Sequence, residues 1–178
     1  MSDRLILVLG GTRSGKSRFG LARARELGGA GPVAYLATAW PGDPELDRRI
    51  EGHRGERPAS WPTVEVGADL AAAIRSVEPT MPVLLDGFTL WLSTIVGDDE
   101  FDLDAILADP VARALEAVRE RAGPVIVVSD EIGLGMVPLD PGARAFRDLL
   151  GIAHQRLAEQ ADEVHFMVAG LPLTLVNR

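Results

Sequence analysis

The sequence contains no cysteine, and this absence excludes disulfide bonds, thiolate metal sites and cysteine nucleophiles. Aromatic residues make up only 5% of the chain, and its formal charge at pH 7 is −8. A nucleic-acid surface needs a basic face and, for single strands, aromatic side chains on which bases stack. We therefore expect no nucleic-acid partner, although Arg48 and Arg49 form a short basic cluster, as do Arg54 and Arg57.

Long hydrophobic runs are missing too. No apolar stretch approaches the roughly 18 residues that indicate a membrane span, and the basic region and cleavage site of a signal peptide do not precede the first apolar strand. The chain has 178 residues, of which 47% are hydrophobic, and both values are typical of one soluble globular domain. We expect a single cytoplasmic domain that spans residues 1–178.

A glycine-rich motif near the start of the chain carries the strongest signal. Residues 10–17 read G-x-x-x-x-G-K-S and follow an apolar run at 5–9, which is the strand–loop–helix context of a P-loop. A structural turn rich in glycine is the alternative, and this context argues against it. In a P-loop the backbone N–H groups surround the phosphates, the lysine reaches the terminal phosphates and the hydroxyl binds Mg²⁺. The predicted phosphate loop consists of Gly10, Gly11, Thr12, Arg13, Ser14, Gly15, Lys16 and Ser17.

Apolar strands alternate with amphipathic helices along the rest of the chain. Because the strands are continuously apolar, we expect a mostly parallel sheet with helices on both faces, which is an α/β fold. The expected strands are 5–9, 33–37, 64–66, 82–86, 125–129 and 163–169. The expected helices are 18–27, 45–52, 69–77, 89–96, 104–121 and 144–160, the fifth of them split at Pro110.

Two strand ends supply further candidate residues. Asp86 ends an apolar run, which is the Walker B pattern of an aspartate that binds Mg²⁺ directly or through water. Such an aspartate can also merely cap the next helix, but the P-loop favours the metal reading. Thr38 ends another strand, and it would lie beside the phosphate loop if the two strands are neighbours. Gly133 and Gly135 permit an irregular loop at the same end of the sheet.

His53 lies in a polar segment with few residues to bury. A solvated charged loop is the plainer interpretation. A neutral imidazole can also attack the α-phosphate of a nucleotide and hold the nucleotide monophosphate covalently, with Arg54 and Arg57 offsetting the phosphate charge. The guanine-selecting N-K-x-D pattern of GTPases is absent, so phosphorylation of a metabolite is the activity that a small acidic P-loop domain favours.

Five motifs occur in an order that resembles one enzyme family. They are G-G-x-R-S-G-K-S at 10–17, Y-x-A-T at 35–38, R-I-x-x-H-x-x-x-R-P at 49–58, L-L-D-x-x-T-L-W-L at 84–92 and E-x-G-x-G-x-V-P at 131–138. This set is similar to the bifunctional adenosylcobinamide kinase / adenosylcobinamide-phosphate guanylyltransferases of cobalamin biosynthesis. The similarity covers essentially the whole chain, to the A-D-E-V at 161–164.

The resemblance implies a RecA-like, three-layer P-loop NTPase fold, a homotrimer and two reactions. ATP or GTP phosphorylates adenosylcobinamide, and GTP then guanylylates a histidine that passes GMP to adenosylcobinamide phosphate. Lys16 and His53 match the catalytic residues, and Ser17 and Asp86 match the Mg²⁺ ligands. Beyond the phosphate loop, the family's nucleotide-binding positions correspond to Ala37, Thr38, Ala39, Arg54, Gly55, Glu56, Arg57, Glu65 and Asp86.

One position departs from the family pattern. The stretch before Glu131 commonly reads S-N-E in relatives, whereas this chain has Asp130 in the middle position. An extra carboxylate there would alter metal or nucleotide preference. Phe88, Trp91, Met136 and Phe146 are candidates for the corrinoid pocket, with core packing as the alternative. Two competing functions stay open at this point: a kinase of another metabolite with a structural His53, and a nucleotide-binding regulatory module without catalysis.

Overall fold

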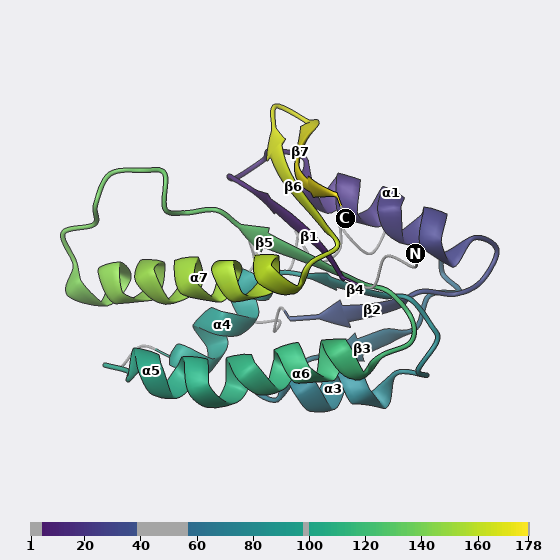
Figure 1. Cartoon of the computed structure of the whole chain (residues 1–178), viewed down its shortest axis with the longest axis horizontal. Coiled ribbons are helices and arrows are strands. Elements are labelled where there is room, and N and C mark those ends of the chain that lie inside the picture. Colours follow the sequence, from purple (N-terminus) through teal and green to yellow (C-terminus); the bar gives the residue numbers. More distant parts are fainter. Residues whose placement is uncertain (1–4, 39–56, 98–99, 178) are drawn as a thin grey trace.

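A computed structural model describes residues 5–38, 57–97 and 100–177 (Figure 1). Its centre is a seven-stranded sheet in the order β3-β2-β4-β5-β1-β6-β7. Neighbouring strands are parallel except for the antiparallel pair β6 and β7. The strands are β1 (Leu5–Gly10), β2 (Ala34–Ala37), β3 (Thr63–Glu65), β4 (Val83–Asp86), β5 (Val125–Asp130), β6 (Glu163–Val168) and β7 (Leu171–Asn177).

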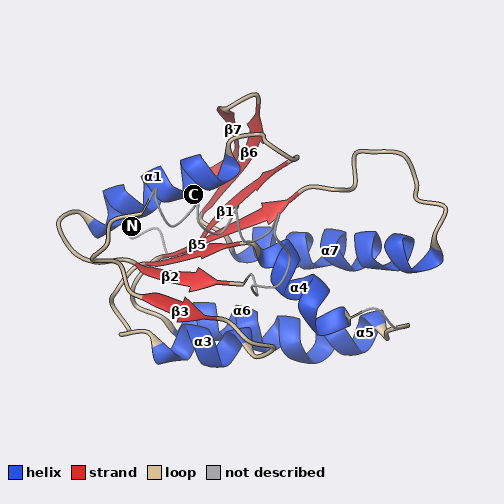
Figure 2. Ribbon diagram, turned by 180° about the vertical axis from the view of Figure 1, so that it is seen from behind, coloured by secondary structure: helices blue, strands red, loops and turns tan. Residues whose placement is uncertain are grey.

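Helices cover both faces of this sheet, which gives three layers (Figures 1 and 2). Helix α1 lies on one face, and α3, α4, α6 and α7 lie on the other. The helices are α1 (Lys16–Gly28), α3 (Leu70–Ser76), α4 (Phe88–Val96), α5 (Leu103–Ile106), the π-helical segment η1 (Leu107–Val111), α6 (Ala112–Glu120) and α7 (Pro141–Gln160). The predicted α/β class with a mostly parallel sheet is confirmed.

The core explains why the strands are apolar without alternation. In β1, Leu5 and Leu7 pack into the cluster beneath α3, α4, α6 and α7, whereas Ile6 and Val8 pack into the cluster beneath α1. Each of these four side chains is at most 2% exposed. A strand buried on both faces places every residue in a core, and this gives the sequence its continuous hydrophobic runs.

The expected α-helix is divided around Pro110, but the chain does not leave the helical path there. The backbone stays helical from α5 through α6, and Pro110 lies inside the π-helical segment η1. A wider turn accommodates a residue that has no N–H to donate and whose ring would clash with the preceding turn. Arg156 of α7 donates to the carbonyl of Leu107 at 2.6 Å, so a side chain from the neighbouring helix satisfies a backbone group at this irregular turn.

The expected closing strand is only half of a hairpin. Strand β6 turns at Ala169 and Gly170, both with positive φ, and returns as β7. Positive φ at both central residues is the geometry of a two-residue hairpin turn. The alternation of Leu171, Leu173 and Leu175 was the signal for this strand in the sequence. The helix expected at 45–52 lies outside the described residues.

Arg121 stabilises the junction between α3 and β4. This residue is 5% exposed, and its side chain donates to four carbonyls: Ile74, Val77, Glu78 and Met81. Burying a guanidinium is costly unless its N–H groups are bonded. Here one residue satisfies the carbonyls at the end of a helix and of the turn that follows it.

We expect Arg121→Met to lower the free energy of unfolding by about 3 kcal/mol, because the substitution removes four hydrogen bonds that a buried guanidinium donates to backbone carbonyls. The exposed Arg119, two residues earlier in α6, provides the matched control, and Arg119→Met should change stability by less than about 0.5 kcal/mol. Urea unfolding of the two variants measures the difference. Equal stabilities would mean that the four hydrogen bonds contribute nothing net.

Candidate nucleotide site

The loop between β1 and α1 has the backbone that its glycines predict. Gly15, with φ of 96°, precedes the first residue of α1, and Arg13 has φ of 56°. A side chain at Gly15 would be strained in this left-handed region, and its Cβ would lie 3.0 Å from Gly170 Cα. A Cβ at Gly10 would lie 2.9 Å from the backbone oxygen of Met167 in β6. Both positions therefore require glycine.

The β6–β7 hairpin holds this loop from outside. Gly170 N donates to the carbonyl of Ser14 at 2.8 Å, and Gly10 pairs with Met167 of β6. Nothing in the sequence motif pointed to Gly170, because the contact joins residues far apart in the chain. The signal that was available is the Ala-Gly pair between two apolar runs, which predicts a tight turn.

Ser17 and Asp86, the two residues expected to bind Mg²⁺, lie next to each other. Ser17 Oγ donates to Asp86 Oδ1 at 3.1 Å. Helix α1 presents the hydroxyl at its first turn, and β4 ends with the carboxylate on the same face of the sheet. A hydroxyl and a carboxylate oxygen are hard donors of the kind Mg²⁺ prefers, and Mg²⁺ commonly takes few protein ligands and keeps several waters. The residues present therefore fit a magnesium ion carried by phosphates.

Lys16 is held by two oxygens of the chain. Its Nζ lies 2.6 Å from Asp130 Oδ1 and donates to the carbonyl of Gly11 at 3.2 Å. Asp130 ends β5 and pairs with Gly10 in the parallel register of β1 and β5. Asp130 therefore lies in direct contact with the lysine of the phosphate loop.

The backbone of Asp130 belongs to a network of polar groups that reaches His154. Asp130 N donates to Thr89 Oγ1 at 2.8 Å, and Thr89 Oγ1 is 2.8 Å from Ser129 Oγ. Ser129 Oγ in turn shares a 2.7 Å hydrogen bond with His154 Nε2. His154 Nδ1 has no hydrogen-bond partner among the described residues and lies 3.8 Å from Glu131 Oε2. The network joins α4, β5 and α7, and it was not predicted.

Burial lowers the pKa of His154 from 6.5 to about 4, against the opposing charges of Glu131 and Asp130. The unfolded chain therefore takes up a proton at this histidine at a higher pH than the folded protein does. Wherever the unfolded state binds more protons, stability rises with pH. The stability that the neutral imidazole contributes is complete above about pH 6.5 and is lost as the pH falls toward about 4.

We expect the wild-type protein to lose about 2 kcal/mol more unfolding free energy than His154→Gln between pH 7 and pH 5. The substitution removes the titrating group and leaves a side chain that can still bond Ser129. Urea unfolding of both proteins across this pH range gives the two slopes. Parallel slopes would contradict the assignment, whatever the difference in absolute stability.

Three predicted site residues are paired side by side at the ends of neighbouring strands. Ala37 at the end of β2 pairs with Glu65 of β3 and with Asp86 of β4. The next residue, Thr38, donates to the carbonyl of Gly87 at 3.1 Å. Thr38 was expected beside the phosphate loop if β2 and β1 were neighbours. They are not neighbours, because β4 and β5 lie between them. Thr38 follows the strand beside Asp86, and its contact is with Gly87.

Arg57 lies over the ring of Tyr35, with its Cζ 3.7 Å from the ring centroid. Burial and the charge of Asp86 raise the pKa of Tyr35, and Arg57 opposes them. Arg57, which follows His53 by four residues, thus packs on Tyr35 of β2, on the face of the sheet that α1 covers. Of the other predicted residues, Ala39, His53, Arg54, Gly55 and Glu56 lie outside the described residues.

The loop after β5 is irregular, as predicted. Arg147 donates to the carbonyls of Gly133 and Met136, and Arg144 donates to those of Pro138 and Leu139. The loop carries highly exposed apolar residues, of which Leu134, Met136 and Leu139 are 80%, 95% and 96% exposed. Of the corrinoid-pocket candidates, Phe88 and Trp91 are buried in the core, so core packing accounts for both.

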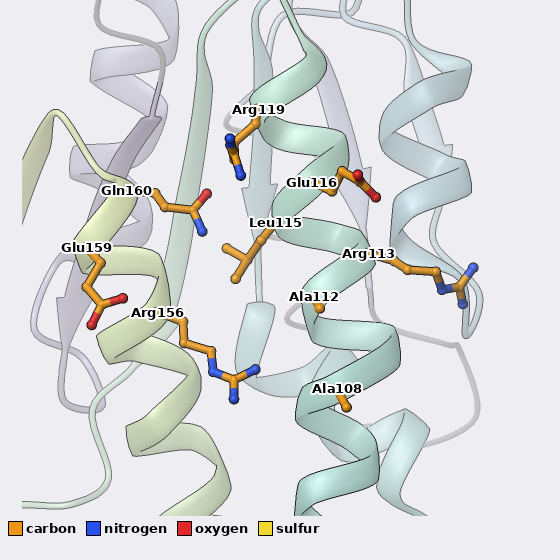
Figure 3. Close-up of a pocket in the computed structure, with 9 residues that line it drawn as sticks. All are labelled: Ala108, Ala112, Arg113, Leu115, Glu116, Arg119, Arg156, Glu159 and Gln160. Atoms are coloured by element: carbon orange, nitrogen blue, oxygen red, sulfur yellow. The ribbon is translucent and has the colours of Figure 1, made fainter.

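A groove of about 580 Å³ lies between α6 and α7 (Figure 3). Its lining mixes arginine and glutamate side chains, and it includes none of the predicted site residues. Within residues 5–38, 57–97 and 100–177, no helix combines the length and apolarity needed to cross a membrane.

A glycine loop between β1 and α1, with its lysine, its serine and an aspartate at the end of β4, defines a P-loop NTPase. Solved structures with the same fold include the flagellar accessory protein FlaH from Methanocaldococcus jannaschii, with a TM-score of 0.54 and 12% identity over 100% of this chain and 80% of that one. A second solved structure, an ATPase domain, has a TM-score of 0.51 and 15% identity over 92% of this chain and 69% of that one.

Within that class, the chain belongs to the cobinamide kinase / cobinamide phosphate guanyltransferase family, whose model matches residues 6–175. It is 46% identical to the bifunctional adenosylcobalamin biosynthesis protein CobP of Pseudomonas aeruginosa, over 95% of each chain. It is 36% identical to the bifunctional adenosylcobalamin biosynthesis protein CobU of Escherichia coli, over 94% of this chain and 97% of that protein. The predicted family and the three-layer, RecA-like P-loop fold are confirmed.

Proposed function

We propose that this chain phosphorylates adenosylcobinamide with ATP or GTP and then transfers GMP from GTP to the product. The transfer yields adenosyl-GDP-cobinamide and pyrophosphate, in cobalamin biosynthesis. The observation that carries the proposal is the match of residues 6–175 to a family with both activities. The assembled loop with Lys16, Ser17 and Asp86 supports it, because both reactions begin with a bound nucleoside triphosphate.

In the kinase step, the aminopropanol hydroxyl of adenosylcobinamide attacks the γ-phosphorus. A new O–P bond forms, the bond to the β–γ bridging oxygen breaks, and the hydroxyl proton leaves to a base or to water. Lys16 neutralises charge on the terminal phosphates, and the N-terminus of α1 adds its positive end. Ser17 and Asp86 would hold Mg²⁺, which would supply further charge neutralisation for the phosphates.

An orphaned polar atom supports phosphate binding in this loop. Ser14 Oγ is buried and has no hydrogen-bond partner among the described residues. Buried hydroxyls are normally bonded, and exceptions indicate a missing ligand or water. A phosphate oxygen would accept from this hydroxyl, alongside the backbone N–H groups of the loop.

In the second reaction, we propose that His53 attacks the α-phosphorus of GTP. A P–N bond forms as the bond to the β-phosphate breaks and pyrophosphate leaves. The phosphate of adenosylcobinamide phosphate then displaces the histidine, so that a P–O–P linkage replaces the P–N bond. The contact of Arg57 with Tyr35, close to Asp86, supports a position for this segment beside the nucleotide.

The remaining predicted residues have proposed roles in binding the nucleotide. Ala37 and Glu65 share a register row with Asp86, which supports a common surface for the nucleoside at the ends of β2, β3 and β4. Ligands of parallel sheets gather at this edge. Thr38 belongs to the same edge, and we propose that Ala39, Arg54, Gly55 and Glu56 complete the site.

The experiment that tests the proposal supplies adenosylcobinamide with Mg²⁺ and either ATP alone or ATP and GTP. Mass spectrometry of the corrinoids should show the phosphate with ATP and the GDP derivative once GTP is present. A kinase of another metabolite would leave adenosylcobinamide unchanged while hydrolysing or transferring phosphate elsewhere. A regulatory module would bind nucleotide and produce neither corrinoid.

We further propose that residues 1–178 act as one cytoplasmic domain and assemble as a homotrimer. The family resemblance implies the trimer, and the exposed β7 face supports self-association: Leu171, Leu173 and Leu175 are 71%, 56% and 57% exposed. An apolar edge strand of this kind commonly pairs with another chain. Sedimentation of the purified protein gives the mass of the assembly, and a monomer at micromolar concentration would contradict the trimer.

A further inference from the structure

Asp130 forms an ion pair with Lys16, the residue that we expect to bind the phosphates. Its Oδ1 lies 2.6 Å from Lys16 Nζ, and the two side chains are 38% and 13% exposed. The same ammonium group donates to the carbonyl of Gly11. Lys16 therefore has two oxygen partners from the chain itself, at the place where a triphosphate would supply its own oxygens.

The position of Asp130 is fixed by its surroundings. Its backbone N–H donates to Thr89 Oγ1, which belongs to the buried network that ends at His154. The next residue, Glu131, donates its N–H to the carbonyl of Gly10 at 3.0 Å. The backbone at Asp130 and Glu131 is thus bonded to α4 on one side and to the phosphate loop on the other, while the carboxylate of Asp130 contacts Lys16.

The two carboxylates of the site have different partners. Asp86 accepts from Ser17, the hydroxyl assigned to the metal, whereas Asp130 pairs with Lys16, the cation assigned to the phosphates. A phosphate chain that binds Lys16 competes with Asp130 for the ammonium group and faces the negative charge of this carboxylate at short range. Like charges at a few ångströms in a partly buried site repel strongly.

We propose that Asp130 is a positioning residue that holds Lys16 in the nucleotide-free protein and makes triphosphate binding depend on a divalent cation. This inference rests on the proposed nucleotide site. A triphosphate chelated by Mg²⁺ carries two fewer negative charges, so it replaces Asp130 on Lys16 with little repulsion. A bare triphosphate meets the full charge of the carboxylate and binds more weakly. Asp130 thereby selects the form of nucleotide that can react.

A purely structural ion pair predicts something different. A partly exposed pair contributes at most about 1 kcal/mol to stability, and its loss would affect nucleotide with and without cation alike. Asp130 as a selector predicts an effect confined to the cation-free nucleotide. The dependence on Mg²⁺, measured by binding and without turnover, separates the two.

The test is isothermal titration of GTP and of ATP into wild type, Asp130→Asn and Asp130→Ser, each in Mg²⁺ and in EDTA. Both variants should bind the bare nucleotides about tenfold tighter than wild type in EDTA, and within about threefold of wild type in Mg²⁺. The serine variant removes the carboxylate without adding an amide donor. Asp148→Asn, at an exposed residue of α7, removes the same charge elsewhere and should stay within about twofold in both buffers.

The inference would be overturned by no gain in EDTA, by an equal gain from Asp148→Asn, or by a gain that is the same with and without Mg²⁺. A gain in Asp130→Asn alone would assign the effect to the new amide, and would also overturn it. If wild type binds neither nucleotide with Mg²⁺, the proposed function falls together with the inference. If wild type binds and phosphorylates normally, a flat response at Asp130 removes the inference only.

Discussion

Lys16→Ala is expected to lower the rate of adenosylcobinamide phosphorylation by at least about a hundredfold. The lysine is the cation of the phosphate loop, and the charge it neutralises grows as the γ-phosphoryl group transfers. Removing one preorganised group that stabilises such charge typically costs a factor of about 10² to 10³. The corrinoid phosphate formed per minute, followed by mass spectrometry at saturating ATP, measures the loss.

The control for this variant is Arg25→Ala, which removes an exposed cation near the other end of α1. It should keep the wild-type rate within about twofold, because it changes the charge of the same helix without touching the loop. Thermal unfolding checks that Lys16→Ala remains folded. Phosphorylation by a folded Lys16→Ala protein at the rate of Arg25→Ala would refute the assigned role of the lysine.

His53→Ala is expected to reduce guanylyl transfer below about one thousandth of the wild-type rate, since it removes the attacking nitrogen. Phosphorylation of adenosylcobinamide should fall much less, because the γ-phosphate reaction needs no protein nucleophile. Protein incubated with GTP labelled in the α-phosphate should carry an acid-labile label that is absent from the variant. This one substitution should therefore abolish guanylyl transfer and leave most of the kinase activity.

The chain contains three histidines, so each can be removed in turn. His154→Gln and His165→Gln should both retain the acid-labile label, and only loss at His53 should abolish it. If the label survives His53→Ala and disappears when another histidine is replaced, that other histidine is the nucleophile. Equal loss of phosphorylation and guanylylation in His53→Ala would indicate that His53 supports the fold and does not react.

Local patterns predicted the parts of the site that are adjacent in sequence. The order of glycines, Lys16 and Ser17 after an apolar run is enough to specify a loop between a strand and a helix, because the backbone geometry is determined within those residues. Asp86 was predicted to join them from a strand end, and its side chain accepts a hydrogen bond from Ser17. The expectation rests on the rule that ligands collect at the carboxyl edge of a parallel sheet.

Strand order and the contacts that depend on it could not be predicted in this way. Apolar runs show that strands exist and do not show which of them are neighbours. Thr38 was therefore expected beside the phosphate loop only if β2 and β1 were neighbours, and they are not. The pairing of Lys16 with Asp130 requires β5 to lie beside β1. The His154 network requires α7 to pack behind that strand, which periodicity alone does not indicate.

The position of β1 in the sheet also has a consequence for how the protein is made. This strand comes first in the described chain, yet its neighbours are β5 and β6, and Leu5 N donates to Asp162 across 157 residues of sequence. During synthesis, β1 therefore emerges from the ribosome long before either strand that it pairs with. Contacts of such high sequence separation form late and slowly. The phosphate loop lies near the start of the sequence, but it acquires its shape only after β6 has been translated.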